Sequence, residues 1–223
     1  MTGPHEGRSV LRAGAPLEEA RAAAILVHGR GGAATDMLGL AAELGVGDLA
    51  FLAPRATGGT WYPYSFLAPL SANEPGLSSA LAVLDEVVGG LAASGIAPER
   101  VALVGFSQGA CLALEFVARR GRPYGGVAGL SGGLIGPPGT PRDYPGSLEG
   151  TPVFLGCSDV DPHIPLARVE ETAAVLGRLG ARVTTRIYPG MGHTVNDDEL
   201  AHLRALLADL VAAPADAPPP TPP

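Results

Sequence analysis

Between residues 22 and 212, short uninterrupted apolar segments alternate with longer segments whose apolar residues follow helical spacing. A short strand without polar alternation has to be covered on both faces. The predicted strands lie at residues 22–29, 49–54, 100–106, 124–132, 151–158 and 181–190. The predicted helices lie at residues 34–45, 77–94, 108–121, 165–180 and 197–212. This order predicts an α/β fold with a mostly parallel central sheet and helices on both faces.

The two ends of the chain fall outside this alternation. The first dozen residues are expected to form either a frayed start or a short edge strand around Val10 and Leu11. Residues 213–223 carry too little apolar bulk to join a core, so we predict an extended, disordered Pro/Ala-rich tail. A chain of 223 residues supplies one sizeable core, which predicts a single domain over residues 1–212.

Charge and cysteine content exclude several classes of protein. The net charge is −7, and the 15 basic residues, all Arg, are spread along the chain, which argues against a nucleic-acid surface. Cys111 and Cys157 sit in apolar contexts typical of small buried hydrophobes in a reducing compartment. The start has no signal-peptide pattern, and we see no apolar run that approaches membrane-spanning length. A cytoplasmic protein is therefore expected.

One serine stands between two glycines where a predicted strand gives way to a predicted helix. The pentapeptide GFSQG, from Gly105 to Gly109, matches G-x-S-x-G, which marks a nucleophile in this strand–helix context. Such a sharp turn strains the backbone of Ser107 and crowds its flanks, so side chains at 105 and 109 would clash. A chance match in a Gly-rich chain is the alternative, and the strand–helix context argues against it.

A serine hydroxyl needs a base, and the base needs an acid that orients it. The chain order expected after such a turn is serine, acid, histidine, and Asp161 and His193 follow Ser107 in that order. Both lie in loops after predicted strands, at the edge where parallel sheets gather functional groups. Asp159 is an alternative acid. The residues favour Asp161, next to Pro162, and Asp159 would then bond nearby backbone N–H groups.

The remaining histidines are weaker candidates for the base. His5 falls in the expected loose start, and His202 falls inside the last predicted helix. His28 ends a predicted strand and is expected to bond the backbone of the adjacent turn. His163 follows the candidate acid closely and is expected to line the site.

Acyl chemistry also needs donors for the developing oxyanion. The backbone N–H of Gln108 opens a helix, where negative charge is favoured. The second donor should come from the loop HGRGG, and we choose the backbone N–H of Arg30. A plain Gly-rich turn is the alternative for this loop.

The loop HGRGG lacks the lysine and spacing of a phosphate loop, and no metal-ligand spacing is found, so neither a metal nor another cofactor is expected.

Together, the segments LVHGRGG, GFSQGACLAL, DPHIPLARV and YPGMGHT resemble the phospholipase/carboxylesterase family of the α/β-hydrolases, which includes small bacterial carboxylesterases and acyl-protein thioesterases. The resemblance spans about residues 23–210. It implies an α/β-hydrolase fold without a large cap domain, and hydrolysis of esters or thioesters without a cofactor. Carried over by position, Ser107 is the nucleophile, Asp161 the acid and His193 the base. The spacing of DPHIP relative to the family's acid loop favours Asp161 over Asp159.

Two features depart from the thioesterase branch of this family. Arg30 stands where an apolar residue is usual, and a long segment over residues 54–76 gathers the only Trp and several of the chain's few Tyr and Phe residues. A long loop at a site is often functional, although this one could instead fill a surface groove. If it lines the site, we expect an apolar pocket for an acyl or alcohol group, with the substrate-binding residues Trp61, Tyr62, Phe66, Leu67, Leu134, His163, Ile164 and Met191.

The sequence therefore predicts a serine carboxylesterase that hydrolyses small to medium-chain esters through an acyl-enzyme. The alternatives are an acyl-protein thioesterase or lysophospholipase, a lactone hydrolase or acyltransferase, and a non-catalytic binding module. Dienelactone hydrolases are disfavoured because they carry Cys where this chain has Ser107. The expected partner is a small-molecule ester, without nucleic acid or membrane insertion, and a homodimer is left open.

Overall fold

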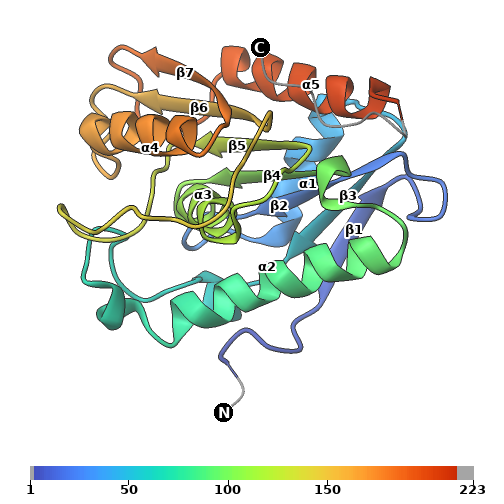
Figure 1. Ribbon diagram of the computed structural model, residues 1–223. Coiled ribbons are helices and arrows are strands. Elements are labelled where there is room, and N and C mark those ends of the chain that lie inside the picture. Colours follow the sequence, from blue (N-terminus) through green and yellow to red (C-terminus); the bar gives the residue numbers. More distant parts are fainter. Residues whose placement is uncertain (1–2, 215–223) are drawn as a thin grey trace.

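The computed structural model describes residues 3–214, and one seven-stranded sheet runs through it (Figure 1). The strand order is β1-β3-β2-β4-β5-β6-β7, with only β1 antiparallel to its neighbour among the described strands. The mostly parallel sheet is confirmed, and the first strand is the edge strand expected around Val10. The strands are β1 (Val10–Gly14), β2 (Ala22–Val27), β3 (Leu49–Pro54), β4 (Val101–Phe106), β5 (Gly126–Leu130), β6 (Pro152–Ser158) and β7 (Arg182–Tyr188).

Five α-helices in the described residues cover the sheet, two on one face and three on the other (Figure 1). The first face carries α1 (Ala34–Leu44) and α5 (Asp197–Ala212). The opposite face carries α2 (Gly76–Ala93), α3 (Gln108–Arg120) and α4 (Leu166–Arg178). Short 3₁₀ helices lie at Thr57–Gly59, Leu70–Asn73 and Pro98–Arg100.

Each central strand feeds two hydrophobic cores, because successive side chains point to opposite faces of a sheet. In β2, Ile25 and Val27 pack in the core under α2, α3 and α4, whereas Ala24 and Leu26 pack in the core under α1 and α5. All six residues of β2 are buried. This double burial explains why the strands read as continuous apolar segments.

Helix α2 corrects one expectation. Its 18 residues have a mean hydropathy of 1.4, so by length and composition alone this segment is apolar enough for a membrane span. The expectation that no apolar run approaches that length is therefore wrong for α2. About 56% of the helix is buried within the protein, where Leu77, Leu84 and Leu91 pack against the sheet.

The start of the chain is more ordered than expected. His5 is buried, not loose: its backbone N–H donates to Ser79 Oγ at 2.9 Å, and its Nε2 lies 2.8 Å from the carbonyl oxygen of Trp61. The backbone N–H of Thr57 donates to His5 Nδ1 at 3.1 Å. The expectation failed because the partners of His5 lie more than 50 residues away in sequence.

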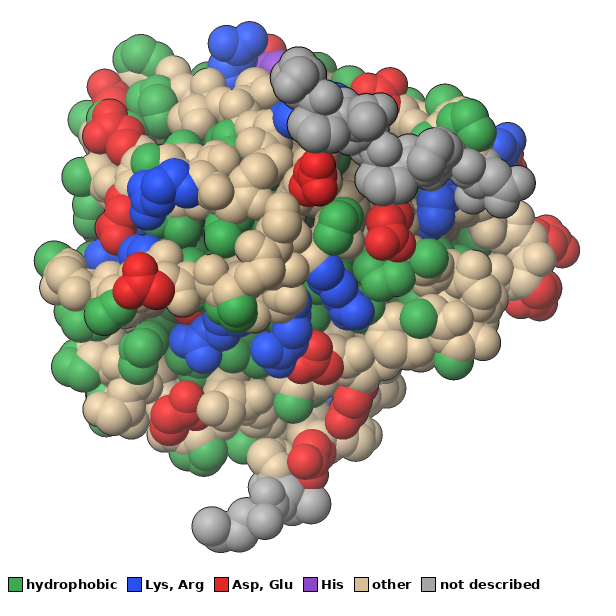
Figure 2. All heavy atoms as spheres, viewed as in Figure 1, with side chains coloured by type: hydrophobic (Ala, Val, Ile, Leu, Met, Phe, Trp, Pro, Cys, Tyr) green, Lys and Arg blue, Asp and Glu red, His purple; other side chains and the backbone are tan. Residues whose placement is uncertain are grey.

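The predicted tail falls almost entirely outside the described residues, which end at residue 214. Figure 2 shows acidic and basic side chains interspersed over the face in view, without a large area of one sign. Cys111 and Cys157 are both buried and free, as the sequence predicted.

Candidate active site

Ser107 occupies a strained turn between β4 and α3. Its φ is 54° and its ψ is −119°, a conformation that costs a non-glycine residue on the order of 1–3 kcal/mol. The two flanking glycines permit the turn: a Cβ at Gly105 would overlap the backbone of Gly109, and a Cβ at Gly109 would overlap the carbonyl of Val27. As the sequence predicts, side chains at positions 105 and 109 would clash, so the turn requires glycine on both sides of Ser107.

A continuous row of hydrogen bonds joins this serine to a histidine and an aspartate. The Ser107 hydroxyl lies 2.8 Å from His193 Nε2, and His193 Nδ1 lies 2.7 Å from Asp161 Oδ2. With the Nδ1 proton donated to the carboxylate, Nε2 is left as an acceptor for the hydroxyl proton. Ser107 follows β4, Asp161 follows β6 and His193 follows β7, so all three lie at the carboxyl edge of the sheet.

Asp161 is fixed as an ionised carboxylate by its surroundings. Its side chain is fully buried, and its Oδ1 accepts the backbone N–H of His163 at 2.8 Å and of Ile164 at 3.1 Å. Burial alone would raise the pKa of Asp161, but the bonds from His193 and these two N–H groups together lower it below the usual value. Such a carboxylate can orient the imidazole and stabilise its charged form.

The neighbouring Asp159 plays a different part. Its Oδ1 accepts the backbone N–H of Gly190 at 2.8 Å, in the loop that leads to His193. Asp159 therefore bonds a backbone N–H, as expected, but one that lies 31 residues further along the chain. It holds the loop of His193, whereas Asp161 contacts the imidazole itself.

Two backbone N–H groups are available beside Ser107. Gln108 opens α3, and Arg30 lies in the turn after β2. Neither N–H donates to another group within residues 3–214. The side chain of Arg30 donates to the carbonyls of Tyr62, Pro63 and Tyr64 at 2.7–2.9 Å, which ties this turn to the segment 54–76.

The sequence analysis missed the part played by the Gln108 side chain. Its Oε1 accepts the backbone N–H of Trp61 at 2.9 Å, and its Nε2 donates to the carbonyl of Tyr62 at 2.8 Å. One amide therefore fixes segment 54–76 against the serine turn. Its place in the GFSQG motif, directly after Ser107, was the only signal in the sequence, because amide pairing with a distant backbone leaves no local pattern.

His28 is a structural residue, as predicted. Its Nδ1 lies 2.8 Å from the carbonyl oxygen of Gly29, and its Nε2 accepts the backbone N–H of Ala56 at 3.2 Å. Burial lowers its pKa, which keeps the ring neutral. His202 lies on α5 and stacks on Phe154 with the ring centres 4.6 Å apart.

A cavity of about 350 Å³ opens beside Ser107, and segment 54–76 forms much of its wall. Of the expected substrate-binding residues, Tyr62, Phe66, His163 and Ile164 lie in this wall. Cys111 also lines it, but burial raises the pKa of its thiol to about 12, so it remains a neutral thiol. The other residues of the wall are Arg30, Pro63, Tyr64, Ser65, Ser107 and Gln108.

Four expected substrate-binding residues lie elsewhere. Trp61 is fully buried, and its indole N–H donates to the carbonyl of His28 at 2.9 Å. Leu134 is buried in the core on the face of α2, α3 and α4, and the partly buried Leu67 packs against that core. The Met191 sulfur accepts the Asn196 amide at 3.0 Å in the loop of His193. The hydrophobic effect therefore draws the large apolar side chains of Trp61 and Leu134 into the core and away from the cavity.

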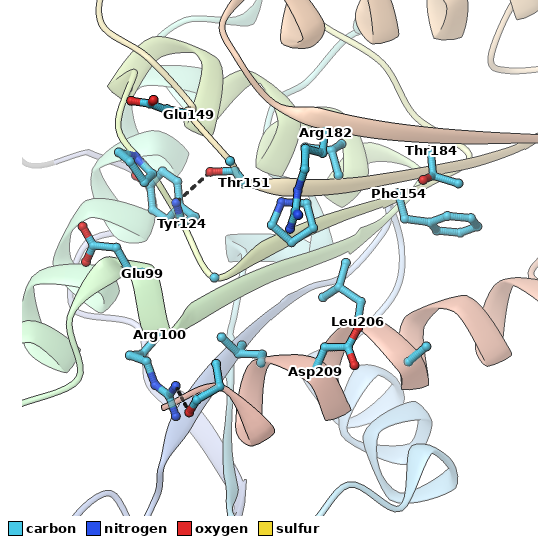
Figure 3. Close-up of a pocket in the computed structure, with 18 of the residues that line it drawn as sticks. Glu99, Arg100, Tyr124, Glu149, Thr151, Phe154, Arg182, Thr184, Leu206 and Asp209 are labelled. Atoms are coloured by element: carbon cyan, nitrogen blue, oxygen red, sulfur yellow. Dashed lines mark hydrogen bonds between the residues drawn. The ribbon is translucent and has the colours of Figure 1, made fainter. Parts of the chain in front are cut away.

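A second cavity, of about 650 Å³, is larger than the one beside Ser107 and lies at the opposite edge of the sheet (Figure 3). Its wall holds Arg182 and Phe154 from the strands, and Leu206 and Asp209 from α5. These residues surround the amino ends of the strands, whereas Ser107 lies at the carboxyl edge. In residues 3–214, no group of three or more His, Cys, Asp or Glu side chains is arranged to hold a metal ion.

Comparison with known proteins identifies the family. The phospholipase/carboxylesterase family model matches residues 11–210. Acyl-protein thioesterase 1 of Saccharomyces cerevisiae is 28% identical over 220 residues, covering 88% of this chain and 96% of that protein. Acyl-protein thioesterase 1 of Gibberella zeae is 36% identical over 119 residues, covering 51% of this chain and 49% of that protein. The chain thus matches about half the length of the second relative.

Solved structures agree with this assignment. A phospholipase/carboxylesterase from Dyadobacter fermentans superposes with a TM-score of 0.86 at 40% identity, covering 93% of this chain and 97% of that one. A carboxylesterase of Bacillus cereus superposes with a TM-score of 0.72 at 21% identity, covering 92% and 95%, which supports the fold. No large cap domain interrupts the described part of the chain. The chain belongs to the phospholipase/carboxylesterase family of α/β-hydrolases.

Proposed function

We propose that this protein is a serine carboxylesterase that hydrolyses small to medium-chain carboxylic esters through a Ser107–His193–Asp161 triad. The observation that carries the proposal is the row of hydrogen bonds at 2.8 Å and 2.7 Å that links the serine to the histidine and the histidine to the aspartate. Membership of an esterase and thioesterase family supports the reaction class.

The first half of the reaction forms the acyl-enzyme. His193 Nε2 takes the proton of the Ser107 hydroxyl as Oγ attacks the ester carbonyl carbon, which gives a tetrahedral oxyanion. The backbone N–H groups of Arg30 and Gln108 stabilise that oxygen. As the bond to the alkoxy group breaks, His193 gives its proton to the leaving alcohol.

The second half regenerates the enzyme. Water enters, gives a proton to His193 Nε2 and attacks the acyl carbon of the Ser107 ester. A second oxyanion forms at the same two N–H groups, and its collapse returns the proton from His193 to Ser107 Oγ. Carboxylic acid leaves, and Asp161 keeps the imidazole in the required tautomer throughout.

The cavity supports small to medium substrates. Its volume of about 350 Å³ falls at the lower end of the range for small-molecule sites, which is roughly 300–1,000 Å³. Apolar atoms of Tyr62, Phe66 and Ile164 in its wall suit the hydrocarbon part of an acyl or alcohol group.

Thioester hydrolysis is the second candidate, because relatives that match this chain are named acyl-protein thioesterase 1. The same residues would cleave a thioester with a thiol as the leaving group. An oxygen ester and a thioester with the same acyl group separate the two activities. A higher kcat/KM for the thioester would make thioesterase the main activity.

The test of the proposal is replacement of Ser107 by Ala. The variant should keep its fold and lose nearly all esterase turnover, together with labelling by a fluorophosphonate probe. Ser94→Ala, which changes an exposed serine at the end of α2, is the matched control and should keep both. Turnover at the wild-type rate in the Ser107→Ala protein would reject the mechanism.

A further inference from the structure

Glu199 is a buried carboxyl without a cationic partner. Its side chain has no exposed surface, and its Oε1 has no hydrogen-bond partner among the described residues. Burial raises the pKa of Glu199 to about 7. A buried polar atom without a partner costs on the order of 1–3 kcal/mol, so a carboxyl at this position needs a compensating role.

One oxygen of Glu199 closes a reciprocal cap at the start of α5. Glu199 Oε2 accepts the backbone N–H of Asn196 at 2.9 Å, and the Asn196 side chain accepts the backbone N–H of Glu199 at 2.9 Å. The Asn196 amide also donates to the Met191 sulfur at 3.0 Å. His193 lies between Met191 and Asn196, so this cap pins both sides of the loop that carries it.

The other oxygen faces the strand that leads to Asp161. Oε1 lies so close to β6 that a Cβ at Gly156 would overlap it. The next residue, Cys157, places its Sγ 3.9 Å from Asp161 Oδ2. Burial raises the pKa of Cys157 to about 11, so the thiol stays protonated beside the carboxylate. The Glu199 carboxyl thus contacts the strand of the acid and the loop of the base together.

We propose that Glu199 is a positioning residue for the triad, whose buried carboxyl fixes the loop of His193 against the strand that leads to Asp161. This inference rests on the proposed function. Asp36 of α1 provides a contrast: it accepts the backbone N–H of Ala33 at 2.8 Å in a similar cap, but it lies exposed. Capping alone therefore does not require burial against the sheet.

The test compares Glu199→Gln with Glu199→Ala, using the full chain, at a pH below 7 and well below the melting temperature of each variant. Gln keeps the oxygen that accepts the Asn196 N–H and mimics the neutral carboxyl, so it should retain most of kcat. Ala releases the loop, and because a misplacement of about 1 Å can cost a hundredfold, kcat should fall on the order of a hundredfold. KM should change little, since Glu199 is not in the cavity wall.

Asp36→Ala is the matched control, because it removes the exposed cap of α1 and should lower the melting temperature without lowering kcat. If Glu199→Ala does not fold, Glu199→Asp withdraws the carboxyl by one methylene and should lower kcat in the same way. Wild-type kcat in the Ala or Asp variant, or an equal loss in Gln and Ala, would overturn the inference. Failure of the proposed function itself would instead appear in the unmodified protein, as no ester turnover and no probe labelling of Ser107.

Discussion

At the scale of the residue, the pKa values of two buried carboxyls, Asp161 and Glu199, shift in opposite directions. Asp161 receives an imidazole N–H and two backbone N–H groups, and its pKa is lowered despite burial. Glu199 receives one backbone N–H, and burial raises its pKa to about 7. The number of donors around each buried carboxyl decides whether its pKa falls below or rises above the ordinary value.

The raised pKa of Glu199 predicts a pH dependence of stability. The folded-state pKa of about 7 exceeds the ordinary value of 4.5, so the stabilising contribution is complete below pH 4.5 and is lost as the pH rises through 7. The loss amounts to about 3 kcal/mol, from roughly 1.4 kcal/mol per pKa unit. Urea unfolding between pH 4 and 8 measures the free energy of unfolding of both proteins. As the pH rises, this free energy should fall in wild type relative to Glu199→Gln, whose amide does not titrate. Parallel stability curves for the two proteins would contradict the prediction.

The two aspartates of the 159–161 loop should differ sharply on substitution. Asp161→Asn removes the charge that holds the His193 tautomer, so kcat should fall by roughly four orders of magnitude. Asp159→Asn keeps an acceptor oxygen for the Gly190 N–H and should have a much smaller effect. Steady-state kinetics on one ester measures both variants, and equal losses would mean that the acid has been misassigned.

At the scale of the element, the serine turn depends on the absence of side chains on both flanks. A Cβ at Gly109 would meet the carbonyls of Val27 and His28, which belong to backbone that cannot rotate away. The end of β2 and the start of α3 therefore touch through this glycine. The same contact brings the Arg30 turn close to Ser107.

Gly109→Ala should therefore destabilise the protein by about 3 kcal/mol, at the upper end of the usual cost of overpacking, and should lower esterase activity. The matched control is Gly89→Ala in α2, where an added Cβ meets nothing within 4 Å. That change should stabilise the protein by up to about 1 kcal/mol, because Ala is the better helix former. Urea unfolding measures both, and a Gly109→Ala protein as stable as wild type would refute the packing argument.

Sequence patterns predict the elements well where a pattern is local. The apolar strands, the helices and the Ser107 turn follow from residues within a few positions of one another. Distant pairings leave no such pattern, which is why the burial of His5 and the contacts of the Gln108 side chain were missed. Trp61 was placed in the substrate wall for its size, but a hydrogen bond to His28 holds it in the core.

At the scale of the whole molecule, the proposed chemistry and the cavity of about 650 Å³ lie at opposite edges of one sheet. Loops after β4, β6 and β7 bring Ser107, Asp161 and His193 together, although the chain order separates them. The larger cavity surrounds the amino ends of the strands and holds none of the three (Figure 3). Cavity size alone would therefore favour the end of the molecule opposite Ser107.

The cavity beside Ser107 predicts a preference for acyl length. With about 350 Å³ available, p-nitrophenyl esters of short to medium acyl chains should give the highest kcat/KM, and long chains should give lower values. A graded ester series measures this directly. A kcat/KM that rises steadily to the longest chains would contradict the proposed substrate range.

The hydrogen bonds of His5 link residues near the start of the chain to the segment that lines the cavity. Its ring contacts the carbonyl of Trp61, 56 positions further along, and the N–H of Thr57, both in the segment that walls the cavity. Trimming residues 1–7 would deprive those two backbone groups of their partners. Removal of residues 1–7 would therefore loosen segment 54–76, which forms much of the wall of the proposed ester-binding cavity.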